Sequence, residues 1–131
     1  MSSAVSREPA ADSAKALEHF SRLLQFETDC WDVHHALGNN KQDFILLDVR
    51  SSQSFEQGHV EGALSLPHQK ITVQTLEAYP EYTLFVVYCA GPHCNATEKA
   101  AIRLAKLGRP VKKMIGGVTG WLDEGFELSC E

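Results

Sequence analysis

Cys89 is the residue of this 131-residue chain whose type and position best suit chemistry. The apolar, β-branched and aromatic run at residues 84–88 directly precedes it and is typical of a buried strand in a parallel sheet. A helical pattern of alanines and leucines follows it and ends at Gly108. Cys89 is therefore predicted to lie where a strand gives way to a loop and the first turn of a helix.

This position favours an ionised Cys89. The first amide groups of a helix have no intrahelical partner, and the helix dipole adds partial positive charge there. Such surroundings lower the pKa of a cysteine from about 8.5 to roughly 3.5–7.5. We therefore interpret Cys89 as a nucleophile that carries a negatively charged group. The alternative, an unreactive core cysteine, is disfavoured by the glycine-containing loop that follows.

The loop after Cys89 supplies the candidate substrate-binding residues. Glycine and proline are expected to shape it so that its backbone amides point at an anion. The candidates are Ala90, Gly91, Pro92, His93, Cys94 and Asn95. His93 either adds positive charge or is simply exposed, and Asn95 or Thr97 caps the helix.

Cys94 lies five positions after Cys89, and three interpretations are open. It is a resolving thiol that forms a disulfide with Cys89, an inert loop residue, or a zinc ligand beside His93. We prefer the inert interpretation, because one nucleophile suffices to carry one transferred group. Zinc would need more ligands than are evident, and the four cysteines match neither a disulfide framework nor paired zinc knuckles. No metal and no organic cofactor is expected.

The composition argues against some classes of partner. A net charge of −5 disfavours a nucleic-acid partner, and no apolar run reaches membrane-spanning length. Residues 1–16 lack the hydrophobic segment of a signal peptide. We therefore expect no nucleic acid and no membrane, and a cytoplasmic protein whose thiols are kept reduced.

Strands that alternate with helices predict an α/β fold with a mostly parallel sheet. The predicted strands are residues 44–49, 63–66, 84–88 and 111–115, and further predicted helices are residues 12–26, 32–37, 51–57 and 72–79. We expect residues 1–28 to form an N-terminal extension with an added helix, and residues 29–131 to form the main domain. The apolar face of that added helix would be Ala16, Leu17, Phe20, Leu23 and Leu24.

A polar set surrounds the end of the first predicted strand. It comprises Asp48, Arg50, Glu56 and His59. One of them could transfer a proton, but we prefer an ion-pair and hydrogen-bond network that holds the loops. Trp121 is interpreted as a core residue.

Four segments, taken in order, resemble the rhodanese family of sulfurtransferases. They are residues 47–50 (LDVR), 55–63 (FEQGHVEGA), 87–89 (VYC) and 116–126 (GGVTGWLDEGF). The resemblance covers residues 44–126, most of the chain. It implies a three-layer sandwich in which helices flank a mostly parallel central sheet.

The resemblance also implies an activity. A rhodanese-like sulfurtransferase would move sulfane sulfur from a small anionic donor such as thiosulfate, through a persulfide on Cys89, to a thiol or protein acceptor. The residues of the Cys89 loop, from Ala90 to Asn95, would bind the donor.

One departure from the family pattern concerns the Cys89 loop. Many members have an arginine near its end, whereas this loop has none and is about two residues longer than the common form. Three alternatives therefore stay open. They are a cysteine-based phosphatase or arsenate reductase-like enzyme on the same fold, a sulfur carrier with dedicated partners, and a non-enzymatic module that binds a partner.

Overall fold

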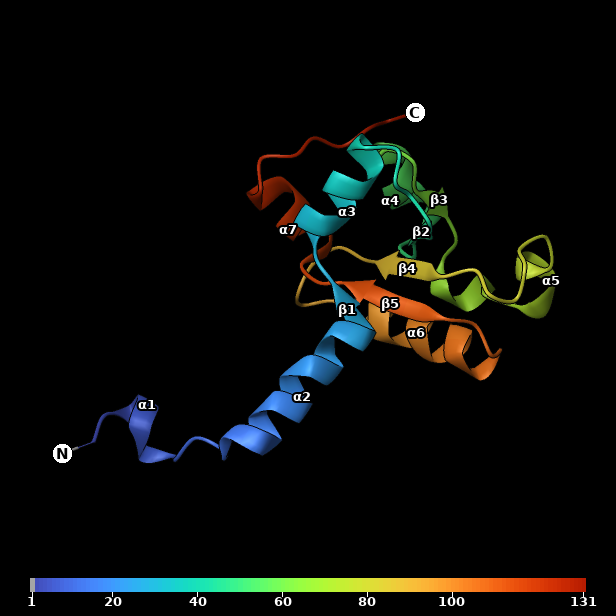
Figure 1. The fold of residues 1–131 in the computed structure, drawn as a ribbon. Coiled ribbons are helices and arrows are strands. Elements are labelled where there is room, and N and C mark those ends of the chain that lie inside the picture. The colour runs from blue at the N-terminus through green and yellow to red at the C-terminus, as the bar shows by residue number, and fades with distance from the viewer. Residues whose placement is uncertain (1) are drawn as a thin grey trace.

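The centre of the molecule is a parallel sheet (Figure 1). The computed structural model describes residues 2–131, and within them five strands lie in the order β1–β5–β4–β2–β3. The strands are β1 (Glu27–Thr28), β2 (Ile45–Asp48), β3 (Leu64–Ser65), β4 (Phe85–Tyr88) and β5 (Val111–Met114). Each neighbouring pair is parallel. The predicted parallel sheet is confirmed, and β4 occupies its middle.

Helices cover both faces of the sheet. The helices of the described residues are α1 (Ala4–Arg7), α2 (Ser13–Phe26), α3 (Cys30–Gly38), α4 (Ser52–Gln57), α5 (Val73–Leu76), α6 (Ala96–Lys106), α7 (Gly117–Asp123) and the 3-10 turn η1 (His68–Lys70), of which α1 and most of α2 extend away from the sheet. Figure 1 shows α5 and α6 on one side, and α3 and α7 on the other. This is the predicted three-layer arrangement. None of the described helices is both long and apolar enough to cross a membrane.

Alternate side chains of β4 belong to two separate cores. Val86 and Tyr88 pack in the core that includes residues of α3 and α7. Phe85 and Val87 pack in the core on the α6 side. Cys89 continues this alternation on the α6 side. The period of two thus fixes the direction of the Cys89 side chain from the buried strand that precedes it.

β1 is a strand that the sequence pattern does not predict. Its two residues are Glu27 and Thr28, which pair with Lys113 and Met114 of β5. The backbone amide of Ile115 then donates to the carbonyl of Thr28 at 2.9 Å. Because these two residues are polar, they form neither an apolar run nor an alternation of apolar and polar residues. Only their pairing with β5 in the folded protein identifies them as a strand.

The predicted N-terminal helix forms, but its apolar face is mostly uncovered. α2 begins after Asp12, whose side chain accepts a capping hydrogen bond from the Lys15 amide at 3.0 Å. Leu17, Phe20 and Leu24 are 71%, 62% and 71% exposed. Figure 1 shows the reason: most of α2 runs away from the sheet, and only its C-terminal end lies beside β1 and β5.

The helix predicted at residues 72–79 is shorter in the structure. α5 begins after Thr72, which forms a capping box with Thr75, and ends at Leu76. The chain then turns, with the Tyr79 amide donating to the Leu76 carbonyl at 3.0 Å. Pro80 follows directly and cannot continue a helix, so the pattern overestimates the length of this element.

Candidate active site

Cys89 lies at the carboxyl end of β4, where ligands of parallel sheets bind. Its side chain is almost fully buried, at 1% exposure for the residue. The first turn of α7 fixes the backbone around it: Val118 donates to the Cys89 carbonyl at 3.0 Å, and Thr119 donates to the Ala90 carbonyl at 2.9 Å. The Thr119 hydroxyl adds a second bond to Ala90 at 3.2 Å. Cys89 is thus held by β4 on one side and by α7 on the other.

The loop after Cys89 turns back on itself before α6. The Cys94 amide donates to the Gly91 carbonyl at 3.1 Å, which closes a tight turn. Ala90, Pro92, His93 and Asn95 are exposed, whereas Gly91 and Cys94 are half-buried. Asn95 occupies the position that caps α6, but its side chain makes no capping hydrogen bond. The predicted position of the cap is therefore correct, but the predicted capping hydrogen bond of the Asn95 side chain is not formed.

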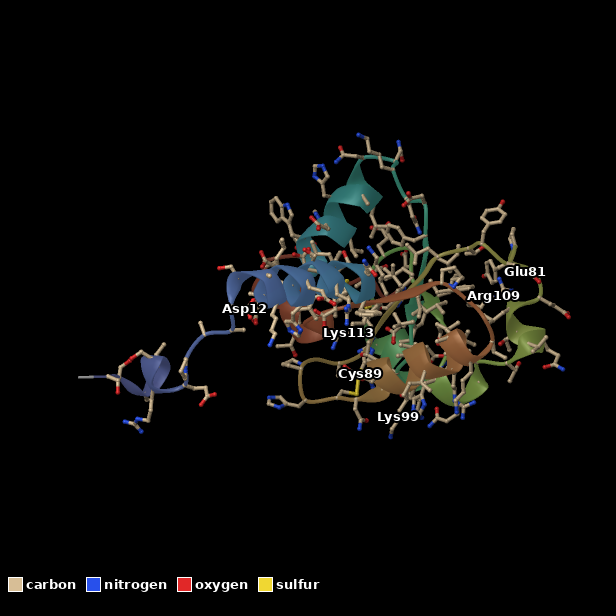
Figure 2. The ribbon with its side chains drawn as sticks, turned by 60° about the horizontal axis from the view of Figure 1, so that its bottom comes forward. Asp12, Glu81, Cys89, Lys99, Arg109 and Lys113 are labelled. Atoms are coloured by element: carbon tan, nitrogen blue, oxygen red, sulfur yellow. A yellow bond between two sulfur atoms is a disulfide. The ribbon has the colours of Figure 1, made fainter. Side chains whose placement is uncertain are left out.

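Cys94 is joined to Cys89 by a disulfide (Figure 2). The two Cα atoms are 6.6 Å apart, within the range that a disulfide spans. The preferred interpretation of Cys94 as an inert loop residue is therefore wrong for this structure, which shows the pairing expected of a resolving thiol. The spacing of five residues did not reveal this, because the folding of the loop, and not its length, brings the two side chains together.

Several amides of this loop are available to an anion. Within residues 2–131, no backbone or side-chain acceptor binds the amides of Ala90, Gly91, His93 and Asn95. A trans peptide directs its N–H opposite to the preceding carbonyl. Because the Cys89 and Ala90 carbonyls point at α7, the amides of Ala90 and Gly91 point away from it. These donors, together with the amides of the first turn of α6, favour negative charge at the loop.

A cavity of about 320 Å³ adjoins the loop. Five of the predicted substrate-binding residues line it: Gly91, Pro92, His93, Cys94 and Asn95. Ala90 and Cys89 do not. The opposite wall of the cavity consists of Thr97, Glu98 and residues 113–117. The sequence pattern did not predict this wall as part of the site. The signal that could have found it is topological, since β5 pairs with β4 and the two strands end at the same edge.

Lys113, labelled in Figure 2, is the lysine of this cavity. It is already paired. Its ammonium group lies 2.7 Å from a carboxylate oxygen of Glu98 and 3.3 Å from one of Glu27. The hydrogen bond to Glu98 raises the pKa of Lys113, and the same bond lowers the pKa of Glu98. The lysine charge is therefore balanced by carboxylates and does not replace the arginine that the loop lacks.

Gly117 lies against the backbone of the loop. A Cβ atom there would meet the Cys89 carbonyl oxygen at 2.4 Å and the Gly91 amide nitrogen at 3.0 Å. The backbone of Gly117 also has a φ of +56°, in the left-handed region. Only glycine allows this close approach between α7 and the loop.

Two members of the predicted polar set, Asp48 and Arg50, form a network at the end of β2 together with Tyr88. Asp48 is fully buried and accepts from the side chain of Arg50 and from the hydroxyl of Tyr88, the latter at 2.7 Å. Arg50 also donates to the Gly58 carbonyl at 2.6 Å, and the Tyr88 hydroxyl accepts from the Val60 amide at 3.1 Å. The hydrogen bond with Asp48 raises the pKa of Arg50, and burial raises that of Tyr88. Each partner is satisfied within the network, which fits a structural role.

His59 and Glu56 lie outside this network. His59 is buried and stacks on Phe55 with 3.7 Å between ring centroids. Its ring nitrogens lie 2.8 Å from the Phe55 carbonyl and 3.1 Å from the Glu131 carbonyl, so it holds the C-terminal segment. Glu56 is exposed. Trp121 is in the core, as predicted, at 3% exposure.

The remaining cysteines lie outside the loop. Cys30 is buried at 4% exposure. Burial, with smaller contributions from Asp29 and Glu124, raises the pKa of its thiol to about 11. Cys130 is exposed and free. Residues 2–131 contain no group of three histidine, cysteine or acidic side chains that could hold a metal ion.

A parallel α/β sandwich with a cysteine loop on its central strand defines a rhodanese-type fold. The chain belongs to the Rhodanese-like domain family, whose family model matches residues 32–124. The resemblance of the four sequence segments is thereby confirmed. The solved structure of the BH2092 protein from Bacillus halodurans is 32% identical, with a TM-score of 0.86 over 90% of this chain and 86% of that one.

Curated relatives differ in what they do. Thiosulfate sulfurtransferase GlpE of Coxiella burnetii is 32% identical over 82 residues, which are 62% of this chain and 74% of GlpE. The HTH-type transcriptional regulator Rv0324 of Mycobacterium tuberculosis is 31% identical over 87 residues, or 66% of this chain. The match spans only 38% of that regulator. The family thus supports sulfurtransferase chemistry in general terms, without a particular donor.

Proposed function

We propose that this protein is a sulfurtransferase that carries sulfane sulfur on Cys89. The observation that carries the proposal is the position of Cys89 at the end of the central strand, next to loop amides that bind no acceptor within residues 2–131. Family membership supports it, because relatives include a thiosulfate sulfurtransferase. The disulfide must first be reduced, since a thiolate is required as the nucleophile.

The chemistry begins with the Cys89 thiolate. It attacks the outer sulfur of a donor such as thiosulfate, the S–S bond of the donor breaks, and sulfite leaves with the bonding electron pair. The product is a persulfide anion on Cys89, with charge conserved. The amides of Ala90, Gly91 and His93 stabilise this anion. A thiol or protein acceptor completes the transfer. A cytoplasmic location, as expected from the sequence, suits this cycle because thiols stay reduced there.

The first prediction is that the reduced protein releases one equivalent of sulfite per chain when mixed with thiosulfate. The nucleophile and the leaving group require this stoichiometry in a single turnover. The measurement is rapid-quench sulfite detection after the reductant has been removed, and an early quench should show one extra sulfur on the Cys89 peptide.

Two variants make this test specific. Cys89→Ser should release no sulfite, because a hydroxyl is a far weaker nucleophile. Cys130→Ser removes an exposed free thiol, whose sulfur lies 3.5 Å from the Gln57 carbonyl, and should match wild type. If thiosulfate fails but another persulfide donor loads Cys89, the carrier alternative replaces the thiosulfate assignment. If no donor loads Cys89, the binding-module alternative stands.

A second prediction is negligible phosphatase activity. Phosphoryl transfer needs cationic groups that stabilise charge in the transition state. The loop has no arginine, and Lys113 is bound by Glu98 and Glu27. Aryl phosphate hydrolysis should therefore equal that of a Cys89→Ser control. Turnover that this substitution abolishes would favour the phosphatase alternative.

A further inference from the structure

We propose that Cys94 attacks the persulfide of Cys89, which releases hydrosulfide and forms the disulfide of this structure. This inference rests on the proposed function and names the next step of the same site. The protein would then be a thiosulfate reductase that uses a dithiol as its electron source, in addition to any transfer of sulfane sulfur to an acceptor.

The two cysteines are held in reach of each other by elements on both sides of the loop. Cys89 is fixed by β4 and by the Val118 amide, 3.0 Å from its carbonyl. The bond from the Cys94 amide to Gly91 holds the other end of the loop. A Cα separation of 6.6 Å lets the two sulfur atoms bond. In the proposed step, Cys94 attacks the Cys89 sulfur, which is the atom it is bonded to in this structure. The disulfide seen here is therefore the product of that step.

Burial favours this internal attack over attack by an external thiol. Cys89 is 1% exposed, and Cys94, not Cys89, lines the adjoining cavity. In this disulfide form, Cys94 is therefore the more exposed of the two cysteines. Cys94 needs no diffusion, and well-oriented intramolecular groups react as if present at about 10⁵–10⁸ M.

The step balances in atoms and electrons. The Cys94 sulfur forms a bond to the inner sulfur of the persulfide, the inner–outer sulfur bond breaks, and the outer sulfur leaves as hydrosulfide. The Cys94 thiol proton goes to the leaving sulfur. Two cysteine sulfurs are oxidised to a disulfide, and the sulfane sulfur is reduced to sulfide.

A dithiol, either small or carried by a protein, returns the loop to its reduced form. The Cys94 sulfur is the accessible one, since Cys94 is half-buried beside the cavity. Attack there expels the Cys89 thiolate, and a thiol with a low pKa is the better leaving group. The reductant becomes a disulfide. Over one cycle, thiosulfate and a dithiol give sulfite, hydrosulfide, a disulfide and one proton.

The test follows the fate of the sulfur in a single turnover without air or added thiol. Reduced wild type, Cys94→Ser and Cys130→Ser are mixed with thiosulfate after the reductant is removed. Hydrosulfide is trapped with monobromobimane, sulfite is measured, and each chain is weighed by mass spectrometry. Wild type and Cys130→Ser should give one sulfite and one hydrosulfide, and end as the Cys89–Cys94 disulfide.

Cys94→Ser should release sulfite, keep the added sulfur on Cys89, and form hydrosulfide at least about 100-fold more slowly, because the internal nucleophile is lost. Equal hydrosulfide release by Cys94→Ser and wild type would overturn the inference, as would a wild-type chain that keeps its persulfide. Failure of the proposed function looks different, since no variant would then release sulfite. Cys94→Ala serves as a second variant, in case serine at this position disturbs folding. Its circular dichroism spectrum should match that of wild type, and it should behave as Cys94→Ser does.

Discussion

Replacing Gly117 with alanine is expected to slow sulfur loading of Cys89 strongly while leaving the sheet folded. The new Cβ would meet the Cys89 carbonyl oxygen at 2.4 Å and the Gly91 nitrogen at 3.0 Å. Both are backbone atoms, so the contact is relieved only when the loop or α7 moves. A displacement of about 1 Å at a reacting group costs roughly 100-fold in rate. Single-turnover sulfite release should fall by at least this factor.

Gly108→Ala is the matched control for Gly117→Ala. Gly108 also has a positive φ, +77°, but a Cβ atom added there would have no neighbour within 4 Å. It therefore shares the left-handed backbone cost of about 1–2 kcal/mol without the contact to the Cys89 loop. It should lose stability and keep normal sulfite release. Equal loading by the two variants would show that the approach of α7 does not position Cys89.

Asp48→Ala is expected to destabilise the protein by about 3–5 kcal/mol, as removal of one partner from a buried ion pair does. The substitution leaves the Arg50 guanidinium, 14% exposed, without its carboxylate. It also removes the acceptor of the Tyr88 hydroxyl. At roughly 2–8 °C per kcal/mol, the melting temperature should fall by at least about 6 °C. Thermal and urea unfolding measure this directly.

Two further variants give smaller expected losses of stability, with which the loss in Asp48→Ala can be compared. Tyr88→Phe removes one donor to Asp48 and leaves the Val60 amide without its acceptor, so a loss of about 1–3 kcal/mol is expected. Asp43→Ala removes an exposed carboxylate just before β2 and should change stability by less than about 0.5 kcal/mol. If Asp48→Ala resembled Asp43→Ala, the network would not contribute to folding.

The order and type of the main elements could be predicted because their signals are local. The run before Cys89 consists of β-branched and aromatic residues, which favour a strand. Gly108 follows the end of α6 and has a positive φ of +77°. Asp12 and Thr72 cap helices that the pattern indicates. The position of Cys89 follows from these elements alone, since it is the residue where β4 stops.

The rest of the site depends on contacts between segments far apart in the chain. Lys113 and Gly117 meet the loop only because β5 pairs beside β4. β1 is recognisable only once β5 is beside it, because Glu27 and Thr28 have no strand pattern of their own. The link between Cys89 and Cys94 depends on a loop turn closed by one backbone bond. None of these contacts has a periodicity that a single sequence reveals.

The division of β4 between two cores has a consequence for the exchange of amide hydrogens with solvent. β4 is shielded on both faces and paired on both edges, so its amides exchange only through near-global unfolding. The amides of Ala90, Gly91 and His93 lack internal acceptors within residues 2–131 and exchange through small local openings. The boundary between the slowest and the fastest protons falls at Cys89. Hydrogen exchange should therefore distinguish the strand that positions the nucleophile from the loop that follows it.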